Sequence, residues 1–323
     1  MKDYIYEVAR IRVMENSLLT KADLDQLLAA PDHEAALAYL ADKGWGGGAG
    51  VTDAETMLKA EEDATWALMT ELLGEGRELD ILRLTRDYHN LKAAIKDIYA
   101  SSGLAPERLY LEGGTVPAEE IRQAVAEENF GRLPEAMQEA AVQAQQVLSR
   151  TGDGQLCDSI IDKAALDALT AAAEDAPDPV LAAYAATTVV NADIRIALRA
   201  AAAGKNAAEI AAQLAEAPDL NRSALAEAAV GGKSSVAEYL KGTPYSALAD
   251  SLSRSMSAFE CACDDLMIDR ILPQKSEALS LGPLAAYVIA RETEIKSVRL
   301  LLTGLQNGLP REQIRESLRQ CYG

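Results

Sequence analysis

Residues 81–99 read ILRLTRDYHNLKAAIKDIY, and this segment indicates the structural class of the chain. Its apolar side chains recur at alternating spacings of three and four residues, at Ile81, Leu84, Tyr88, Leu91, Ile95 and Ile98. This spacing places them on one face of an α-helix, because the helix makes one turn in about 3.6 residues. Gly103 is the predicted end of this helix, since glycine adopts the left-handed conformation that closes many helices. The segment therefore predicts a long helix with one buried face.

A three-residue pattern within this helix recurs twice further along the chain. Each copy has a polar, a branched apolar and a basic residue, and the copies are Asn90-Leu91-Lys92, Asp193-Ile194-Arg195 and Glu294-Ile295-Lys296. The copies begin 103 and 101 residues apart, and Gly204 and Gly308 follow the second and third copies. The pattern predicts three long helices, each followed by a turn and a further apolar helix.

Two weaker patterns support the same repeat. An apolar residue precedes an aromatic residue by five positions three times, at Leu40 and Trp45, Val125 and Phe130, and Leu240 and Tyr245. The segment Ile161-Asp162-Lys163 is matched by Ile268-Asp269-Arg270. The common order predicts a threefold repeat whose copies are long enough to be helical domains. We expect domains at 1–107, 108–212 and 213–323, and the chain termini could pack across them. The domains could close into a ring or funnel, or lie in a row.

Glycine and proline mark the expected turns between helices. Gly113-Gly114 lies after the first long helix, and residues 44–50 predict a loop. Asp178-Pro179 and Gly282-Pro283 are typical starts for the second and third long helices, because proline is tolerated in the first helical turn.

The composition favours an all-α protein. Apolar residues make up 49% of the 323 positions and aromatic residues only 5%, while alanine is abundant. Alanine favours helices because it loses no side-chain entropy in them. Apolar β-branched and aromatic residues rarely alternate with period two, which is the pattern typical of strands.

The charge makes some partners improbable. The 50 Asp and Glu residues outnumber the 31 Lys and Arg residues, so the net charge is −19. Such a surface would repel nucleic acid and an anionic bilayer, and would attract a basic protein. No apolar run approaches the ~20 residues of a membrane helix, and Met1–Arg12 lacks the apolar core of a signal peptide. We therefore expect a soluble, cytoplasmic chain without a membrane span of its own.

No catalytic or nucleotide-binding motif is complete. Gly231-Gly232-Lys233-Ser234 resembles the end of a phosphate-binding loop, but Glu227 stands where that motif needs its first glycine. The two histidines, His33 and His89, have no metal-ligand spacing, and the four cysteines are expected to be reduced. We expect no catalytic residue, no metal and no cofactor.

The densest acidic group is Asp264, Asp265 and Asp269. We interpret it as a solvated helix face beside Arg270, and cation binding is the alternative.

Several segments resemble the C subunit of the V/A-type rotary ATPases, whose counterpart in eukaryotic vacuolar enzymes is termed the d subunit. They are Tyr6-Glu7-Val8-Ala9-Arg10-Ile11-Arg12 with Leu18-Leu19, residues 39–45, Asp87-Tyr88-His89-Asn90-Leu91-Lys92, residues 291–305 and residues 308–311. The resemblance covers essentially the whole chain and is weakest at 106–160.

The resemblance implies three helical domains around a pseudo-threefold axis, forming a funnel. It implies that the funnel sits on the membrane ring of proteolipids, the c-ring, and receives the central shaft, made of the D and F proteins, in its wide mouth. The chain would then be a non-catalytic part of the rotor, peripheral to the membrane, that transmits torque for ATP-coupled transport of protons or sodium ions. One alternative is a helical scaffold or adaptor unrelated to rotary ATPases. Another is an all-helical enzyme with a buried carboxylate or a metal site.

The polar and basic members of the threefold pattern form the candidate site. They are Asn90, Lys92, Asp193, Arg195, Glu294 and Lys296. Around a threefold axis they would make a ring of polar groups suited to contact the shaft. The other interpretation is that they form salt bridges within their own domains or are solvated.

Overall fold

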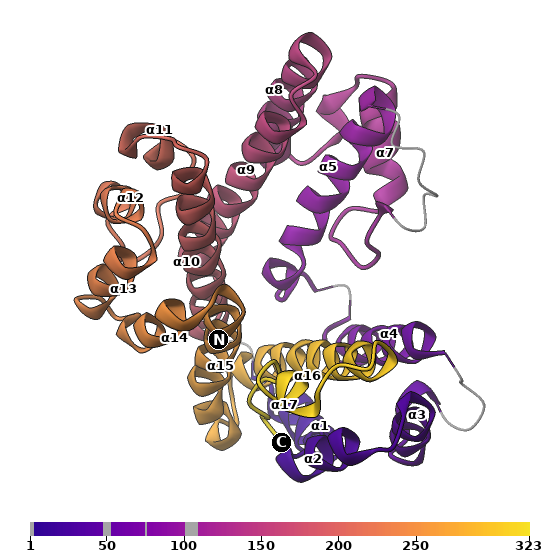
Figure 1. The fold of residues 1–323 in the computed structure, drawn as a ribbon. Coiled ribbons are helices and arrows are strands. Elements are labelled where there is room, and N and C mark those ends of the chain that lie inside the picture. The colour runs from indigo at the N-terminus through magenta and orange to yellow at the C-terminus, as the bar shows by residue number, and fades with distance from the viewer. Residues whose placement is uncertain (1–2, 48–52, 75, 101–108) are drawn as a thin grey trace. The chain divides into compact units, whose positions relative to one another are not determined.

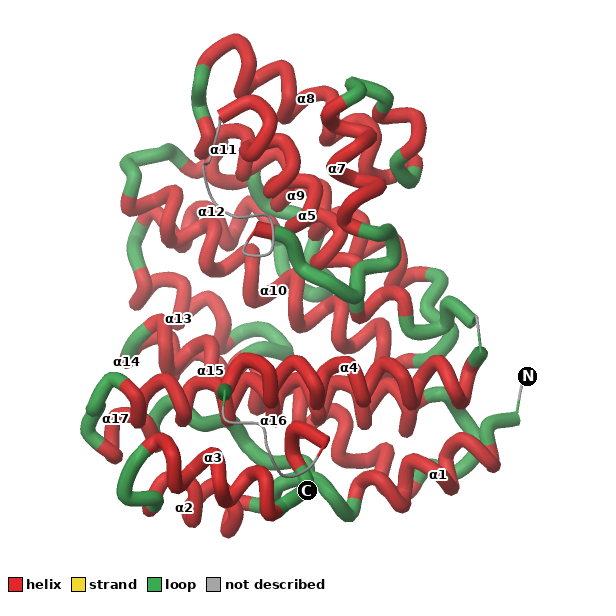
Figure 2. The backbone as a smooth tube through the Cα atoms, turned by 90° about the vertical axis from the view of Figure 1, so that its right-hand side faces the viewer, coloured by secondary structure: helices red, strands yellow, loops and turns green. Residues whose placement is uncertain are grey.

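The computed structural model describes residues 3–47, 53–74, 76–100 and 109–323. Every regular element in these residues is a helix, and Figures 1 and 2 show no strand among them. The all-α prediction is therefore confirmed. The chain forms two compact units, one of Met1–Arg77, Pro177–Val180 and Ala247–Gly323, the other of Glu78–Ala176 and Leu181–Ser246.

The first unit contains elements from both ends of the chain. They are α1 (Ile5–Glu15), α2 (Lys21–Ala29), α3 (His33–Asp42), η1 (Trp45–Gly47), α4 (Ala54–Leu73), α14 (Ala249–Arg254), α15 (Met256–Ile271), η5 (Leu272–Ser276), α16 (Gly282–Gln306) and α17 (Arg311–Arg315).

The second unit is built from the middle of the chain. It contains η2 (Asp80–Leu82), α5 (Leu84–Ala100), α7 (Ala118–Ala126), η3 (Phe130–Arg132), α8 (Glu135–Thr151), α9 (Gly154–Glu174), α11 (Ala207–Ala211), α12 (Arg222–Val230) and α13 (Lys233–Lys241). It also holds most of α10 (Pro179–Ala202), and η4 (Ser246–Leu248) follows at its C-terminal boundary.

One hydrophobic core joins N-terminal helices to C-terminal ones. Leu27, Leu40 and Met57 of α2, α3 and α4 are fully buried, and they share a cluster with Val298 and Leu301 of α16. Figure 1 shows α16 beside α4 in this unit. Burial of one such side chain stabilises the fold by roughly 1.5–3 kcal/mol. Residues expected in the first and third domains therefore fold around a common core.

A second core forms on the apolar face of α5. Tyr88, Leu91 and Ile95 are buried against Ile121 and Val125 of α7, and α8 and α9 complete the cluster. The face that the three-and-four spacing predicted is thus covered by the helices that follow it in the chain. The expected division after residue 107 would separate α5 from these helices.

The predicted starts of the second and third long helices, and the glycines predicted to follow them, are confirmed. α10 begins at Pro179 and α16 begins at Gly282. Gly204 and Gly308 follow their last turns with φ values of 80° and 65°, the left-handed region that glycine tolerates. Gly103 lies outside the described residues.

The apolar–aromatic pattern marks one local structure three times. Leu40, Val125 and Leu240 are fully buried near the C-terminal ends of α3, α7 and α13. A short 3-10 turn follows each helix, at the aromatic residue or directly after it, as η1, η3 or η4. The division into three domains and the funnel arrangement stay predictions.

Within the described residues, α10 is long and apolar enough to cross a membrane by length and composition alone. Half of its most apolar window is buried inside the protein, and a core helix meets the same criteria. Its buried residues include Leu181, Val189 and Ile194, which belong to its apolar face.

Candidate partner-binding site

Asn90 is a fully buried amide on α5 that binds the backbone of the segment following that helix. Its Nδ2 donates to the carbonyl oxygen of Leu111 at 2.8 Å, and the Leu111 N–H donates to its Oδ1 at 2.7 Å. Both sides of the amide are therefore satisfied within the second unit. A buried amide without such partners would cost roughly 1–3 kcal/mol.

Asp193 occupies the matching position on α10 and is 1% exposed. The N–H of Ala215, which lies in the segment after α11, donates to its Oδ1 at 3.1 Å. Burial raises the pKa of this carboxyl to about 7, because the charged form is poorly solvated there.

Glu294 belongs to a nearly buried ion cluster in the first unit. Arg291 forms ion pairs with both Glu294 and Glu61, and the three side chains are 6%, 9% and 14% exposed, respectively. The N–H of Leu19 donates to Glu294, and the guanidinium of Arg291 lies 5.1 Å from the centre of the Trp45 ring. Burial raises the pKa of Glu294. The cluster joins α16 to α4, η1 and the segment before α2.

The two lysines of the set form ion pairs within their own units. The Nζ of Lys92 lies 2.5 Å from an oxygen of Asp162 on α9, and the Nζ of Lys296 lies 2.5 Å from an oxygen of Asp264 on α15. The side chain of Lys296 stays 49% exposed, and Arg195 is an exposed residue.

The polar members therefore differ from the basic ones in how far they could contact a partner protein. Asn90, Asp193 and Glu294 face inward and hold backbone segments in place. Arg195 and Lys296 are the members that present charge to solvent. The first four members of the set lie in the second unit, and the two on α16 lie in the first. The contacts agree with the intramolecular interpretation for most of the set, and shaft contact stays a prediction.

Asp87 of α5 is a buried carboxylate that was not among the predicted site residues. It accepts the Thr115 N–H at 2.8 Å and the Val116 N–H at 3.2 Å, and burial raises its pKa. A Cβ atom at Gly114 would lie 2.2 Å from its Oδ1, so glycine is needed there. The glycine pair at 113–114 was the only signal of this contact in the sequence.

The acidic group on α15 was expected to be solvated, but it binds the C-terminal segment. Asp264 pairs with Arg319 at 2.8 Å, and Asp265 accepts the Gln320 N–H at 2.7 Å. Asp269 accepts from the side-chain amide of Gln320 at 2.9 Å. The solvated-face interpretation is corrected, because these carboxylates are acceptors for a segment about fifty residues away in sequence.

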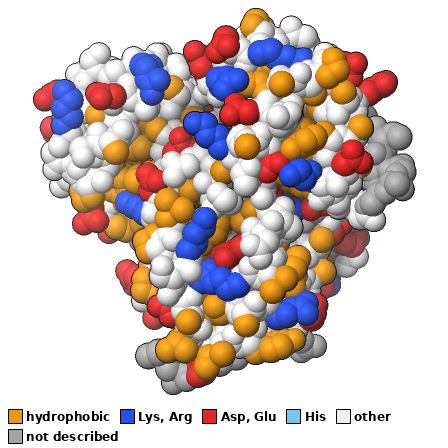
Figure 3. Space-filling view, turned by 90° about the horizontal axis from the view of Figure 1, so that it is seen from below, with side chains coloured by type: hydrophobic (Ala, Val, Ile, Leu, Met, Phe, Trp, Pro, Cys, Tyr) orange, Lys and Arg blue, Asp and Glu red, His pale blue; other side chains and the backbone are white. Residues whose placement is uncertain are grey.

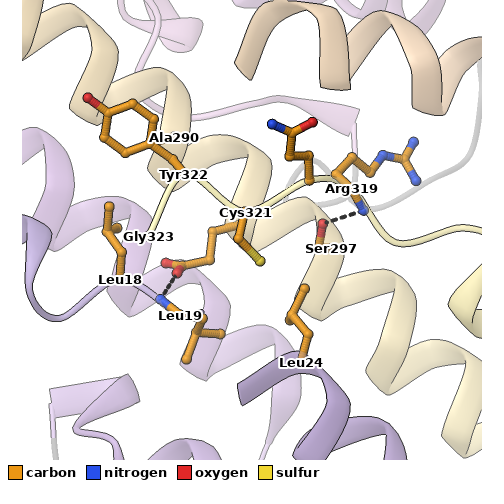
Figure 4. Close-up of a pocket in the computed structure, with 11 residues that line it drawn as sticks. Leu18, Leu19, Leu24, Ala290, Ser297, Arg319, Cys321, Tyr322 and Gly323 are labelled. Carbon is orange, nitrogen blue, oxygen red and sulfur yellow. Dashed lines mark hydrogen bonds between the residues drawn. The ribbon is translucent and has the colours of Figure 1, made fainter. Parts of the chain in front are cut away.

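A pocket of about 290 Å³, including space open to solvent, lies beside this segment in the first unit (Figure 4). Figure 4 shows the Arg319 N–H bonded to Ser297, and the Leu19 N–H donates to a carboxylate oxygen of Glu294 in the same pocket. Burial raises the pKa of the Cys321 thiol to about 11, so it is protonated and unreactive at neutral pH. These contacts hold the chain end against α16, which is a packing role.

Basic, acidic and apolar side chains are intermixed over the face seen in Figure 3. Among the described residues, no group of three or more His, Cys, Asp or Glu side chains is placed to hold a metal ion.

Three relatives match the chain over most of its length, and each is the C subunit of its complex. The one from the V-type ATP synthase of Thermus thermophilus is 27% identical over 98% of both chains. The one from the A-type ATP synthase of Methanocaldococcus jannaschii is 24% identical over 98% of this chain and 86% of its own length. The one from the V-type sodium ATPase of Enterococcus hirae is 22% identical over 84% of this chain and 83% of its own length.

A family model supports the same assignment. The model described as ATP synthase (C/AC39) subunit matches residues 8–317, which include most of both compact units and all six residues of the candidate site. The chain belongs to the ATP synthase (C/AC39) subunit family.

Proposed function

We propose that the chain is the non-catalytic connector in the rotor of a V/A-type ATPase, linking the D–F shaft to the proteolipid c-ring in the membrane. The observation that carries this proposal is the family match over residues 8–317. A relative from a V-type ATP synthase matches over 98% of both lengths, so the likeness is not confined to one segment. In this role the chain rotates with the ring and transmits torque.

Torque transmission requires a body that deforms little under load. The first half of α16 is buried along its whole circumference, from Gly282 to Arg291. The ion cluster of Arg291 adds contacts to α4 and to the segment before α2. Close-packed interiors of this kind have low compressibility and transmit strain, which supports a mechanical role.

The three-domain architecture is part of the proposal, with an altered grouping of helices. Each domain would begin with a long helix, α5, α10 or α16. The domain that begins with α16 would be completed by α2, α3 and α4 from the other end of the chain. The shared cluster of Leu27, Met57 and Val298 supports that grouping, and so does the recurring helix and 3-10 turn.

We place the shaft contact at the exposed members of the threefold pattern, Arg195 and Lys296. Their positive charges stand out on a chain with net charge −19, so they would bind acidic groups on the shaft. The acidic remainder of the surface would attract basic loops on the ring or shaft. Such contacts weaken as salt increases, because exposed charges are screened beyond about 8–10 Å at physiological ionic strength.

The test is binding of the full chain to the purified D–F shaft, measured by light scattering and calorimetry at low and moderate salt. We expect a one-to-one complex that salt weakens. Arg195→Glu with Lys296→Glu should weaken it further, whereas Lys59→Glu on the exposed side of α4 should not. Equal affinity of all variants would contradict the assigned contact residues. The same measurement is made with the purified membrane sector. Absence of binding to both the shaft and the membrane sector would contradict the connector role.

A further inference from the structure

Asp193 is a buried carboxylate that has no ion pair among the described residues. It is 1% exposed, and its recorded partner is the N–H of Ala215. Ala215 lies in the segment at residues 212–220, here called the α11–α12 connector. Leu214 and Ala215 are buried, so the connector is packed against its unit around this contact. A charge at such a site is costly unless it is paired.

The basic side chains that act on Asp193 are themselves close to other carboxylates. Lys163 of α9 pairs with Asp167 at 2.6 Å, and Arg222 at the start of α12 lies 3.9 Å from Glu216. Burial raises the pKa of Asp193 and outweighs the groups around it. The Ala215 N–H favours the charged form of Asp193, Asp167 repels it, and Lys163 and Arg222 attract it from a distance. No group therefore compensates fully for a charge on Asp193.

Asn90, at the matching position on α5, shows how a neutral side chain binds the backbone of the segment that follows its helix. Asn90 accepts the Leu111 N–H and also donates to the Leu111 carbonyl oxygen. The spacing is nearly the same, since Leu111 is 21 positions after Asn90 and Ala215 is 22 positions after Asp193. A carboxylic acid has the same two capacities as an amide, whereas a carboxylate only accepts.

We propose that Asp193 works as a protonated acid that clasps the α11–α12 connector, accepting the Ala215 N–H and donating its O–H to a carbonyl of the same segment. Loss of this proton removes the donor and leaves a buried charge, so the clasp opens as pH rises. The clasp is a pH-sensitive element in the second unit. It does not depend on the proposed rotor function, and the two can fail separately.

The direction of the pH dependence follows from the raised pKa. The carboxyl has a pKa of about 7 in the folded protein and about 3.9 in an exposed chain. The closed clasp therefore binds the extra proton, and the stabilisation that this proton gives to the closed clasp is complete below about pH 4. Between about pH 4 and pH 7 the equilibrium constant for opening rises about tenfold for each pH unit, and above about pH 7 it is constant.

The first test is infrared difference spectroscopy of the full chain between pH 5.5 and 8.5. We expect a protonated-carboxyl C=O band at the lower pH that is weaker in Asp193→Asn, because Asp87 and Glu294 also have raised pKa values and can contribute to it. Asp175→Asn, at an exposed position after α9, should keep the band. A band that persists unchanged in Asp193→Asn would overturn the proposal.

The second test is hydrogen–deuterium exchange of the α11–α12 connector, corrected for intrinsic exchange. Protection in the wild-type chain should fall about tenfold per unit between pH 5 and 7 and then level off. Asp193→Asn should show no such slope, and the reciprocal Asn90→Asp should introduce one at residues 109–111. The same slope in wild type and Asp193→Asn would contradict the clasp.

Discussion

Arg291 lies between two carboxylates that are themselves nearly buried. It carries one positive charge against the two negative charges of Glu61 and Glu294, and all three side chains are at most 14% exposed. The N–H of Gly46 donates to Glu61 at 2.7 Å, and the N–H of Leu19 donates to Glu294. The two backbone N–H groups add hydrogen bonds to the carboxylates, but the positive charge of the cluster comes from Arg291. The cluster is therefore stable only while Arg291 is present.

We predict that Arg291→Ala destabilises the first unit by about 3–5 kcal/mol, because it leaves two buried carboxylates without a cation. Urea unfolding followed by circular dichroism measures the change. Adding Glu61→Gln and Glu294→Gln to that variant should recover part of the loss. Arg299→Ala, at an exposed pair with Glu55, should stay within about 0.5 kcal/mol of wild type. Similar losses for Arg291→Ala and Arg299→Ala would refute the role of the cluster.

Gly114 offers a test of the contact between α5 and the segment after it. A methyl group there would lie 2.2 Å from Asp87 Oδ1, so Gly114→Ala must displace a carboxylate that holds two backbone N–H groups. We expect a loss of about 1–3 kcal/mol in thermal or urea unfolding. Gly131→Ala is the matched control, because its nearest neighbour would be 3.8 Å away. Equal stability of Gly114→Ala and Gly131→Ala would contradict the contact between Gly114 and Asp87.

The sequence could identify the threefold polar pattern but not the direction in which each side chain points. A polar residue beside an apolar stripe has the same spacing whether it faces a partner or the chain's own backbone. Asn90, Asp193 and Glu294 proved to bind backbone N–H groups of segments far from them in sequence. Those segments have no periodic pattern, so their positions could not be predicted from spacing.

At the scale of elements, the short helices after the closing glycines pack back onto their long helices. α17 places Ile314, which is 3% exposed, against Gly304 of α16, where a Cβ would lie 2.7 Å from its side chain. α11 buries Ile210 completely. Both agree with the prediction from the sequence that a further apolar helix follows each of Gly204 and Gly308.

We predict that Ile314→Ala and Ile210→Ala each cost about 2–5 kcal/mol, because each removes a buried side chain that holds a five-residue helix. Shifts in the unfolding midpoint by circular dichroism measure both. Leu309→Ala is the control, since Leu309 is 42% exposed. Wild-type stability of either isoleucine variant would mean that the short helix contributes little to its unit.

Elements with a clear period and an end signal could be predicted from the sequence, and others could not. The starts of α10 and α16 follow from Asp178-Pro179 and Gly282-Pro283. The first long helix begins three residues later than the apolar stripe, because Asp80–Leu82 form a separate 3-10 turn. Such 3-10 turns are hard to recognise in a sequence, because the apolar residues keep nearly the same spacing through the turn and the helix that follows it.

At the scale of the whole molecule, the first unit depends on both ends of the chain. Leu24, Leu37 and Leu58 from the N-terminal part share a cluster with Ile295 and Leu302. The sequence left open that the chain termini pack across the expected domains, but residue spacing alone could not say which helices they would join.

We predict that a fragment of residues 78–246 folds by itself, since it contains all of the second unit. It should be helical by circular dichroism and unfold cooperatively. A fragment of residues 1–77 should not, because it lacks the part of its core that α16 and α17 supply. A cooperatively folded 1–77 fragment would contradict the shared core.

The most direct test of the connector role is ATP-driven ion transport by the complete membrane complex, prepared with and without this chain. Complex that lacks the chain should hydrolyse ATP without transporting ions into vesicles, and adding back the purified chain should restore transport. Arg195→Glu with Lys296→Glu should restore it less well than wild type. Transport that is equally efficient with and without the chain would contradict a role in linking shaft and ring.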